Sequence, residues 1–261
     1  MRIYQVDSFT DQLFSGNPAG VCLLAEEWLP EDLMQKIAME MNLSETTFVR
    51  RGEDGSMEIR WFTPMAEVDL CGHATLAAAH VLFRHEKFPN KELTFQSRKG
   101  FLKVTDEGKL LTLDFPRDYV YPIEFTEDLD CFNQKPREAW RGTGEYLLVF
   151  DRQEQVEDAV CNLNKAAGID LDGFIITAPS NIEGVDFVSR YFSPKYGIDE
   201  DPVTGSAHTL LVPYWQGVTG QDTFHARQLS IRGGNLTCRA VGDRILISGQ
   251  AVTFFVGEMI L

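Results

Sequence analysis

The pattern of apolar and polar positions alternates between strand-like and helix-like segments along the whole chain. Short runs rich in β-branched and aromatic residues, such as Met57-Glu-Ile-Arg-Trp-Phe62 and Phe187-Val-Ser-Arg-Tyr-Phe192, predict strands. Apolar residues at helical spacing predict helices over about 31–42, 72–85, 153–166 and 204–214. We also expect a hairpin turn at 53–55 and a linker with a short helix over 117–145. Many strands with few helices predict an α+β fold.

One composite motif occurs twice. Arg60-Trp-Phe-Thr-Pro64 precedes Asp69-Leu-Cys-Gly-His73, and Arg190-Tyr-Phe-Ser-Pro194 precedes Asp201-Pro-Val-Thr-Gly-Ser206. Cys71 and Asp201 each fall seven residues after the proline, and each copy then enters an apolar run compatible with a helix. A strand, loop and helix repeated in the same order indicate a duplicated half.

The repeat predicts two pseudo-symmetric lobes, each a mostly antiparallel sheet curled around a central helix. We place an N-terminal lobe at 1–116 and a C-terminal lobe at 117–251, with a final strand, 252–261, that can rejoin the first lobe. The cleft between the lobes is the expected small-molecule site, because such clefts are favoured binding places. Helix N-termini at Gly72 and Gly205 would offer backbone N–H groups to an anion there. A small carboxylated substrate is therefore expected.

Composition narrows the possible partners. The chain of 261 residues has a net charge of −15 and no cluster of Lys and Arg, which argues against nucleic-acid binding. No apolar run reaches membrane-spanning length and no signal peptide is visible at the N-terminus, so we expect a cytoplasmic protein without a membrane partner. Five cysteines without CxxC spacing argue against a zinc cage and a disulfide framework. Phosphate-loop, dinucleotide, zinc-protease and serine-hydrolase motifs are absent, which favours chemistry without metal or cofactor.

Several residues could carry that chemistry. Glu45, beside apolar Leu43 and Phe48, could accept and return a proton, although a solvated loop glutamate is the commoner case. Cys71 could be a thiolate activated by a helix N-terminus or a small buried cysteine. Its counterpart in the repeat is Asp201, so a racemase with paired thiols is disfavoured. Asp201 is either a helix cap or a catalytic carboxylate.

The residues next to these are candidates for substrate contact. His73 either orients a substrate or bonds to backbone, whereas His80 and His208 suit packing positions in apolar helices. Ser206 is either a hydroxyl contact or a small residue for close packing, and Thr204, Gly72 and Gly205 complete the predicted binding loops.

Taken together, the motifs resemble the phenazine-biosynthesis PhzF-like family within the diaminopimelate-epimerase-like fold. The matching segments span the whole chain: Val6-Asp-Ser-Phe9, Ser15-Gly-Asn-Pro-Ala-Gly20, Asn42-Leu-Ser-Glu-Thr46, Arg60-Trp-Phe-Thr-Pro64, Leu70-Cys-Gly-His-Ala-Thr75 and Glu200-Asp-Pro-Val-Thr-Gly-Ser-Ala207. The resemblance implies an isomerase, a homodimer, and a C-terminal strand that returns to the first lobe. It gives Glu45 the role of proton shuttle that a glutamate has in members isomerising a dihydrohydroxyanthranilate, and it makes His73, Asp201 and Ser206 site residues.

Two alternatives remain open at this level. Cys71 stands where related epimerases hold one catalytic thiol, so Cys71 and Asp201 could act as opposing acid and base in an epimerase or racemase. The fold could also serve as a binding or interaction module without catalysis.

Overall fold

The computed structural model describes residues 1–25, 27–52 and 56–261. The chain forms two compact units, Met1–Asp114 with Ser248–Leu261, and Phe115–Ile247. The predicted lobes divide at 116 and 251, close to these positions. The hairpin turn expected at 53–55 lies outside the described residues.

The first unit consists of strands around one buried helix. Its elements are β1 (Arg2–Ser8), β2 (Asn17–Leu23), α1 (Glu31–Met41), β3 (Glu45–Arg51), β4 (Met57–Phe62), β5 (Glu67–Val68), α2 (Gly72–Arg84), β6 (Glu92–Ser97), β7 (Gly100–Asp106) and β18 (Ala251–Glu258). β8 (Leu111–Pro116) runs from this unit into the second one.

The second unit repeats this composition with shorter helices. Its elements are β9 (Tyr121–Ile123), the 3-10 helix η1 (Glu127–Leu129), β10 (Glu138–Arg141), β11 (Glu145–Val149), α3 (Gln153–Glu157), α4 (Leu163–Ala167), β12 (Gly173–Pro179), β13 (Phe187–Ser193), the 3-10 helix η2 (Pro194–Tyr196), β14 (Ile198–Asp201), α5 (His208–Thr219), β15 (Thr223–Gln228) and β16 (Gly234–Val241). β17 (Arg244–Gly249) leads back to the first unit.

Strand pairing follows the same order in both units. In the first, β2 is parallel to β3, β3 antiparallel to β4, and β4 parallel to β6. In the second, β11 is parallel to β12, β12 antiparallel to β13, and β13 parallel to β15. The antiparallel pairs β1–β2 and β6–β7 correspond to β10–β11 and β15–β16. The predicted pseudo-symmetric α+β lobes are therefore confirmed.

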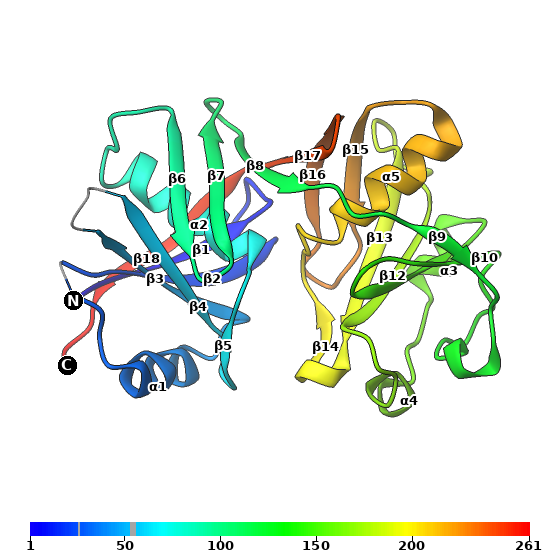
Figure 1. Cartoon of the computed structure of the whole chain (residues 1–261), viewed down its shortest axis with the longest axis horizontal. Coiled ribbons are helices and arrows are strands. Elements are labelled where there is room, and N and C mark those ends of the chain that lie inside the picture. The colour runs from blue at the N-terminus through cyan, green and yellow to red at the C-terminus, as the bar shows by residue number, and fades with distance from the viewer. Residues whose placement is uncertain (26, 53–55) are drawn as a thin grey trace. The chain divides into compact units, whose positions relative to one another are not determined.

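The helix α2 is the centre of the first unit. It packs against β1, β2, β3, β7 and β18, and lies among these strands in Figure 1. Every residue from Gly72 to Ala79 is buried. Four alanines on this helix let the strands approach closely, because their side chains are short: Ala74, Ala77, Ala78 and Ala79. The position of Gly72 and His73 at the helix start is thus fixed by the core.

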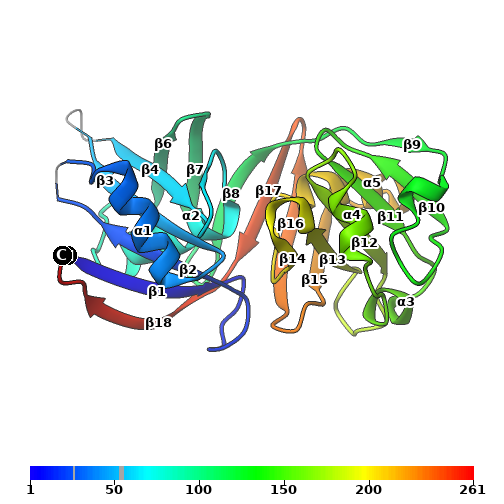
Figure 2. The same ribbon diagram turned by 90° about the horizontal axis from the view of Figure 1, so that it is seen from below.

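The last strand completes the first unit. β18 pairs antiparallel with β1, from Arg2 opposite Glu258 to Ser8 opposite Ala251, and the two strands run side by side in Figure 2. The terminal residues also bond to each other, because the N–H of Met259 donates to Met1 O at 2.7 Å. The two ends of the chain therefore belong to one sheet.

In the second unit, α5 is the buried helix. Trp215 stacks on Phe187 of β13, with ring centroids 5.5 Å apart and an interplanar angle of 8°. Pro213 lies inside this helix and has no N–H for the carbonyl of Thr209. The N–H of Asp118 donates to that carbonyl at 3.2 Å, so the proline leaves no acceptor unpaired.

Two predicted segments differ from the structure. The helix predicted over 153–166 is two short helices, α3 and α4, because Phe132 and Cys161 form a bridge that holds the chain extended between them. The predicted linker over 117–145 contains the strands β9 and β10, which pair with each other. Its predicted short helix is the single turn η1.

Candidate functional site

The first unit gathers three potential acid–base groups at the N-terminus of α2. Glu45 is the first residue of β3, and Cys71 and His73 flank the first residue of α2. Glu45 Oε2 lies 3.1 Å from His73 Nε2, and Cys71 Sγ lies 3.5 Å from His73 Nδ1. All three side chains are buried, with 8%, 7% and 5% exposure for Glu45, Cys71 and His73. Glu45 Oε2 makes no well-aligned hydrogen bond within the described part of the chain.

Asn17 determines the tautomer of His73. Its amide Nδ2 lies 3.1 Å from His73 Nδ1, and an amide nitrogen can only donate, so Nδ1 accepts as the amide is oriented here. The proton of the neutral imidazole is then on Nε2, facing Glu45. The hydroxyl of Ser8 donates to the carbonyl of His73 at 2.8 Å and fixes the backbone beneath the ring. The contact of Asn17 with the ring and the bond from Ser8 to the backbone thus orient the imidazole before any substrate is bound.

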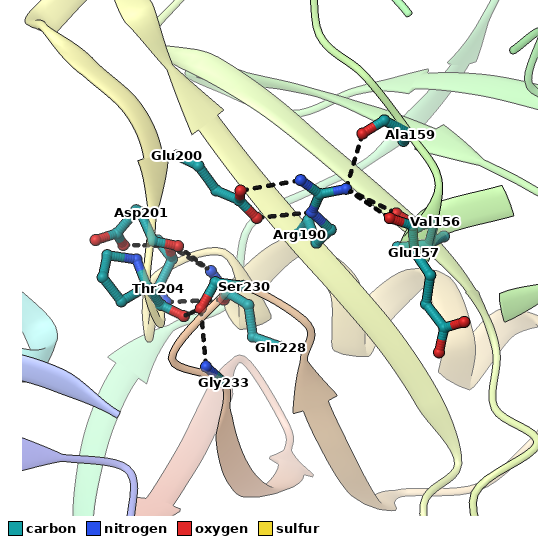
Figure 3. A network of polar contacts seen from close by, with 11 residues as sticks. Val156, Glu157, Ala159, Arg190, Glu200, Asp201, Thr204, Gln228, Ser230 and Gly233 are labelled. Carbon is teal, nitrogen blue, oxygen red and sulfur yellow. Dashed lines mark hydrogen bonds and ion pairs between the residues drawn. The ribbon is translucent and has the colours of Figure 1, made fainter. Parts of the chain in front are cut away.

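The second unit holds Asp201 in a buried polar network (Figure 3). The hydroxyl of Thr204 donates to Asp201 Oδ2 in a short hydrogen bond. Gln228, which is fully buried, donates from Nε2 to the carbonyl of Asp201 at 2.7 Å and accepts from the N–H of Thr204 at 2.8 Å. One amide therefore connects both ends of the loop that carries the carboxylate.

Further hydrogen bonds connect the same loop to the segment 230–233. The hydroxyl of Ser230 donates to Pro202 O at 2.7 Å and accepts from the N–H of Gly233 at 3.0 Å (Figure 3). Gly233 has a φ of 64°, a left-handed conformation that glycine adopts without strain. The segment 230–233 is therefore a turn that supports the Asp201 loop.

An arginine–glutamate pair precedes Cys71 in the sequence of the first unit, and another precedes Asp201 in the second. On β4, Arg60 contacts Glu67 of β5 through Nε at 2.7 Å and Nη2 at 2.6 Å. On β13, Arg190 contacts Glu200 of β14 through Nε at 2.6 Å and Nη2 at 2.9 Å (Figure 3). Both pairs are bidentate, the geometry in which a guanidinium binds a carboxylate most strongly. The repeated arginine of the motif thus has the same structural role in both units.

The remaining predicted residues lie close to these clusters in sequence and structure. Gly72 opens α2, whereas Gly205 and Ser206 form the turn just before α5, which begins at His208 and not near 204 as predicted. Ser206 O accepts from the hydroxyl of Thr209, which tightens this turn. At the start of α5 the N–H groups of His208 and Thr209 donate to the carbonyls of Gly205 and Ser206, so the turn before the helix satisfies them.

Of the histidines predicted to pack inside helices, His208 is fully buried and His80 is half-buried. Burial lowers the pKa of His208 to about 4, and its Nδ1 lies 3.0 Å from Thr204 O. Burial likewise lowers the pKa of His80 to about 4. Neither imidazole carries a charge at neutral pH.

Two supporting residues escaped the sequence analysis. Asn17 lies within the quoted segment Ser15-Gly-Asn-Pro-Ala-Gly20, so the family motif could have singled it out. Gln228 ends β15 on the same face as buried Phe224 and Ala226, so the alternation indicates its burial but not the groups that it contacts. Only the three-dimensional contact between β15 and the loop shows its role.

Glu145 is a second unusual carboxyl of this unit. Burial raises its pKa to about 7, and the nearby negative charges of Asp118 and Asp172 add to the rise. Hydrogen bonds from Gly144 and Tyr191 act in the opposite direction. Tyr191 lies directly opposite Asp201 in the pairing of β13 with β14. The charge of Glu145 therefore changes near neutral pH on the same strand ladder as Asp201.

The first unit also contains a group of atoms that could bind a metal ion. Glu45, Cys71 and His73 each offer one ligand atom, and these atoms lie within 4.8 Å of one another.

No helix in the described ranges is long and apolar enough to cross a membrane.

Known proteins resemble this chain over its full length. Residues 6–257 match the family model described as phenazine biosynthesis-like protein, PhzC-PhzF. A Pseudomonas aeruginosa protein named as an uncharacterized isomerase is 45% identical over 260 residues, which cover 99% of this chain and 98% of the relative. The crystal structure of a PhzF-family phenazine biosynthesis protein from Enterococcus faecalis has 44% identity and a TM-score of 0.94, covering 100% of this chain and 99% of that one.

A more distant structure shows how widely the fold is used. A Pseudomonas aeruginosa protein described as a predicted epimerase has 20% identity and a TM-score of 0.73, with 100% of this chain and 99% of that chain covered. At this identity the likeness shows the fold alone.

The fold and the relatives define an enzyme of the isomerase class. The chain belongs to the PhzC-PhzF family of phenazine biosynthesis-like proteins, which confirms the resemblance found in the sequence.

The amide of Gln228 can be tested by an isosteric substitution. Gln228→Glu removes the donor to the carbonyl of Asp201 and adds a negative charge beside that residue. We expect a loss of about 2–4 kcal/mol in the free energy of unfolding, because a buried acceptor is left unpaired next to a buried charge. Urea denaturation measures the loss, with Gln221→Glu on the exposed surface as the matched control. Equal stability of the two variants would contradict the structural role of Gln228.

The titration of Glu145 predicts a pH-dependent stability. Its folded pKa of about 7 exceeds the ordinary value of 4.5, so the folded protein retains a proton that the unfolded chain has lost. Its contribution to stability is therefore complete below pH 4.5 and declines as pH rises to 7. Since Glu145 keeps part of its surface in water, we expect the decline to be about 1–2 kcal/mol.

Glu145→Gln should remove this part of the pH dependence. Chemical denaturation at pH 4.5 and pH 8 compares the variant with the wild type and with Glu124→Gln, an exposed carboxyl of the same unit. An unchanged pH dependence in Glu145→Gln would show that Glu145 titrates normally.

Proposed function

We propose that this isomerase moves a proton on a small carboxylated substrate, with the carboxyl of Glu45 as general acid and base. The observation that carries the proposal is the buried carboxylate held 3.1 Å from His73 Nε2. We further propose that the reaction needs no cofactor or metal ion, and that the protein acts as a cytoplasmic homodimer without nucleic-acid or membrane partners.

The environment of Glu45 suits a proton shuttle. Its Oε2 makes no well-aligned hydrogen bond among the described residues, so it is available to a C–H group of the substrate. Nε2 of His73 lies 3.1 Å from this oxygen, and the contact with Asn17 favours the proton on that nitrogen, so the ring attracts the carboxylate without a well-aligned hydrogen bond. Glu45 would remove a proton from one carbon and, as the acid it has become, return it to another. The second transfer restores the carboxylate of Glu45, so the net charge of the site is the same before and after the reaction.

The second cluster would hold the substrate. In the proposal, Asp201 and Ser206 contact the same molecule as Glu45, and Thr204 and Gln228 keep Asp201 in place. The backbone N–H groups at Gly72 and Gly205 would bind its carboxylate, since helix N-termini stabilise negative charge. Positioning of this kind and stabilisation of developing charge supply most of the rate enhancement in such enzymes.

A conservative substitution separates proton transfer from binding. Glu45→Gln preserves size and removes the base, so we expect loss of solvent-deuterium incorporation by at least about 100-fold with substrate binding nearly unchanged. The probes are the dihydrohydroxyanthranilate isomerised by phenazine-pathway members and any carboxylate that co-purifies with the protein. Nuclear magnetic resonance in heavy water measures the incorporation.

The matched control for this variant is Glu40→Gln, a neighbouring exposed glutamate on α1. It should exchange deuterium at the wild-type rate. Retained exchange in Glu45→Gln would exclude Glu45 as the proton-transferring group.

A second candidate function follows from the position of Cys71. Its Sγ lies 3.5 Å from His73 Nδ1, so the imidazole would take the thiol proton on this nitrogen in place of the contact with Asn17. Cys71 and Asp201 would then act as opposing acid and base in an epimerase. In that case Cys71→Ser would abolish inversion at the substrate carbon, followed by chiral chromatography, whereas Glu45→Gln would retain it. If Cys71→Ser retains full turnover, the epimerase is excluded.

A further inference from the structure

The three potential ligands in the first unit have a spacing that suits a soft divalent cation. A tetrahedral Zn²⁺ ion with a sulfur at about 2.3 Å and an imidazole nitrogen at about 2.0–2.1 Å places these two atoms about 3.5 Å apart. The distance from Cys71 Sγ to His73 Nδ1 is 3.5 Å. Two ligands from the same helix start are therefore already at the separation that zinc requires.

Glu45 supplies a third ligand atom. Its carboxylate oxygen lies within 4.8 Å of the ligand atoms of Cys71 and His73. An ion at this place would bind Glu45 Oε2, which makes no well-aligned hydrogen bond among the described residues. It would also replace the contact of Asn17 with His73 Nδ1. Three protein ligands leave one tetrahedral position for water, as in open zinc sites.

Burial opposes the deprotonation of the other four thiols of the chain. Burial raises the pKa of Cys22 and of Cys161 to about 12, and it also raises the pKa of Cys131 and Cys238. A thiol must lose its proton to bind zinc, so these four sites resist binding at neutral pH. The cysteine count argues against a four-ligand cage, but it does not bear on a site with three mixed ligands.

We propose that Glu45, Cys71 and His73 form a zinc-binding site at which Zn²⁺ inhibits the enzyme reversibly. On binding, the zinc–sulfur bond forms and the thiol proton of Cys71 passes to solvent, without any oxidation or reduction. The carboxylate of Glu45 becomes a ligand and can no longer accept a proton from carbon. The inhibitory consequence rests on the proposed function, whereas the binding site itself does not.

Cobalt titration of the full-length protein tests the site without a substrate. Co²⁺ occupies tetrahedral zinc sites, and a cobalt–thiolate bond gives a strong charge-transfer absorption in the near ultraviolet. We expect this absorption in the wild type and in Cys161→Ser, its loss in Cys71→Ser, and its bleaching by added Zn²⁺. Glu45→Gln should keep the absorption with an affinity lower by about 10–100-fold. Thermal unfolding checks that the variants are folded.

Each outcome decides one part of the proposal. The same absorption in Cys71→Ser, or none in the wild type at millimolar Co²⁺, would overturn the site. If zinc binds but deuterium exchange continues at saturating Zn²⁺, zinc does not inhibit the enzyme and Glu45 is not the proton-transferring group. The zinc-binding site itself is then still supported. If Glu45→Gln retains exchange and zinc still bleaches the cobalt spectrum, only the proposed function is refuted.

Discussion

The arginine–glutamate pair that spans two neighbouring strands is the constraint on which both clusters depend. In each unit the arginine is on the strand before the loop, and its glutamate is on the short strand that leads into the loop. The guanidinium groups also lie over the phenylalanine two residues further on, at 5.2 Å for Phe62 and 5.0 Å for Phe192. Because charge and ring contacts fix the same side chain, the chain leaves the sheet at a defined point.

Beyond this shared frame, the two units have diverged toward different chemistry. The position seven residues after the motif proline holds the thiol of Cys71 in one unit and the carboxylate of Asp201 in the other. The first is oriented by an imidazole and the second by a hydroxyl and an amide. The duplication therefore provides the same strand arrangement with different side chains at this position, although Cys71 directly precedes α2 and Asp201 ends β14.

The sequence predicted the parts of this arrangement that local patterns encode. The motif with Arg60, its copy with Arg190, and the helix start at Gly72 are continuous segments whose spacing reveals them. Family resemblance selected Glu45, which composition alone would have left among many surface carboxylates. The contacts of Asn17 with His73 and of Gln228 with Asp201 depend on strand pairings between distant segments, so no window of the sequence contains them. The same reason explains the broken helix over 153–166, since the bridge from Phe132 to Cys161 is also long-range.

The C-terminal strand has a consequence for how the protein is made. The second unit, Phe115–Ile247, is one continuous segment, whereas the first needs Ser248–Leu261 to complete its sheet through β18. During synthesis on the ribosome, domains fold as their segments emerge. The later half can close while the earlier half still exposes β1 as an open edge, which invites pairing with other chains. The emergence of β18, and not that of the first hundred residues, therefore sets the moment at which the N-terminal half is safe from aggregation.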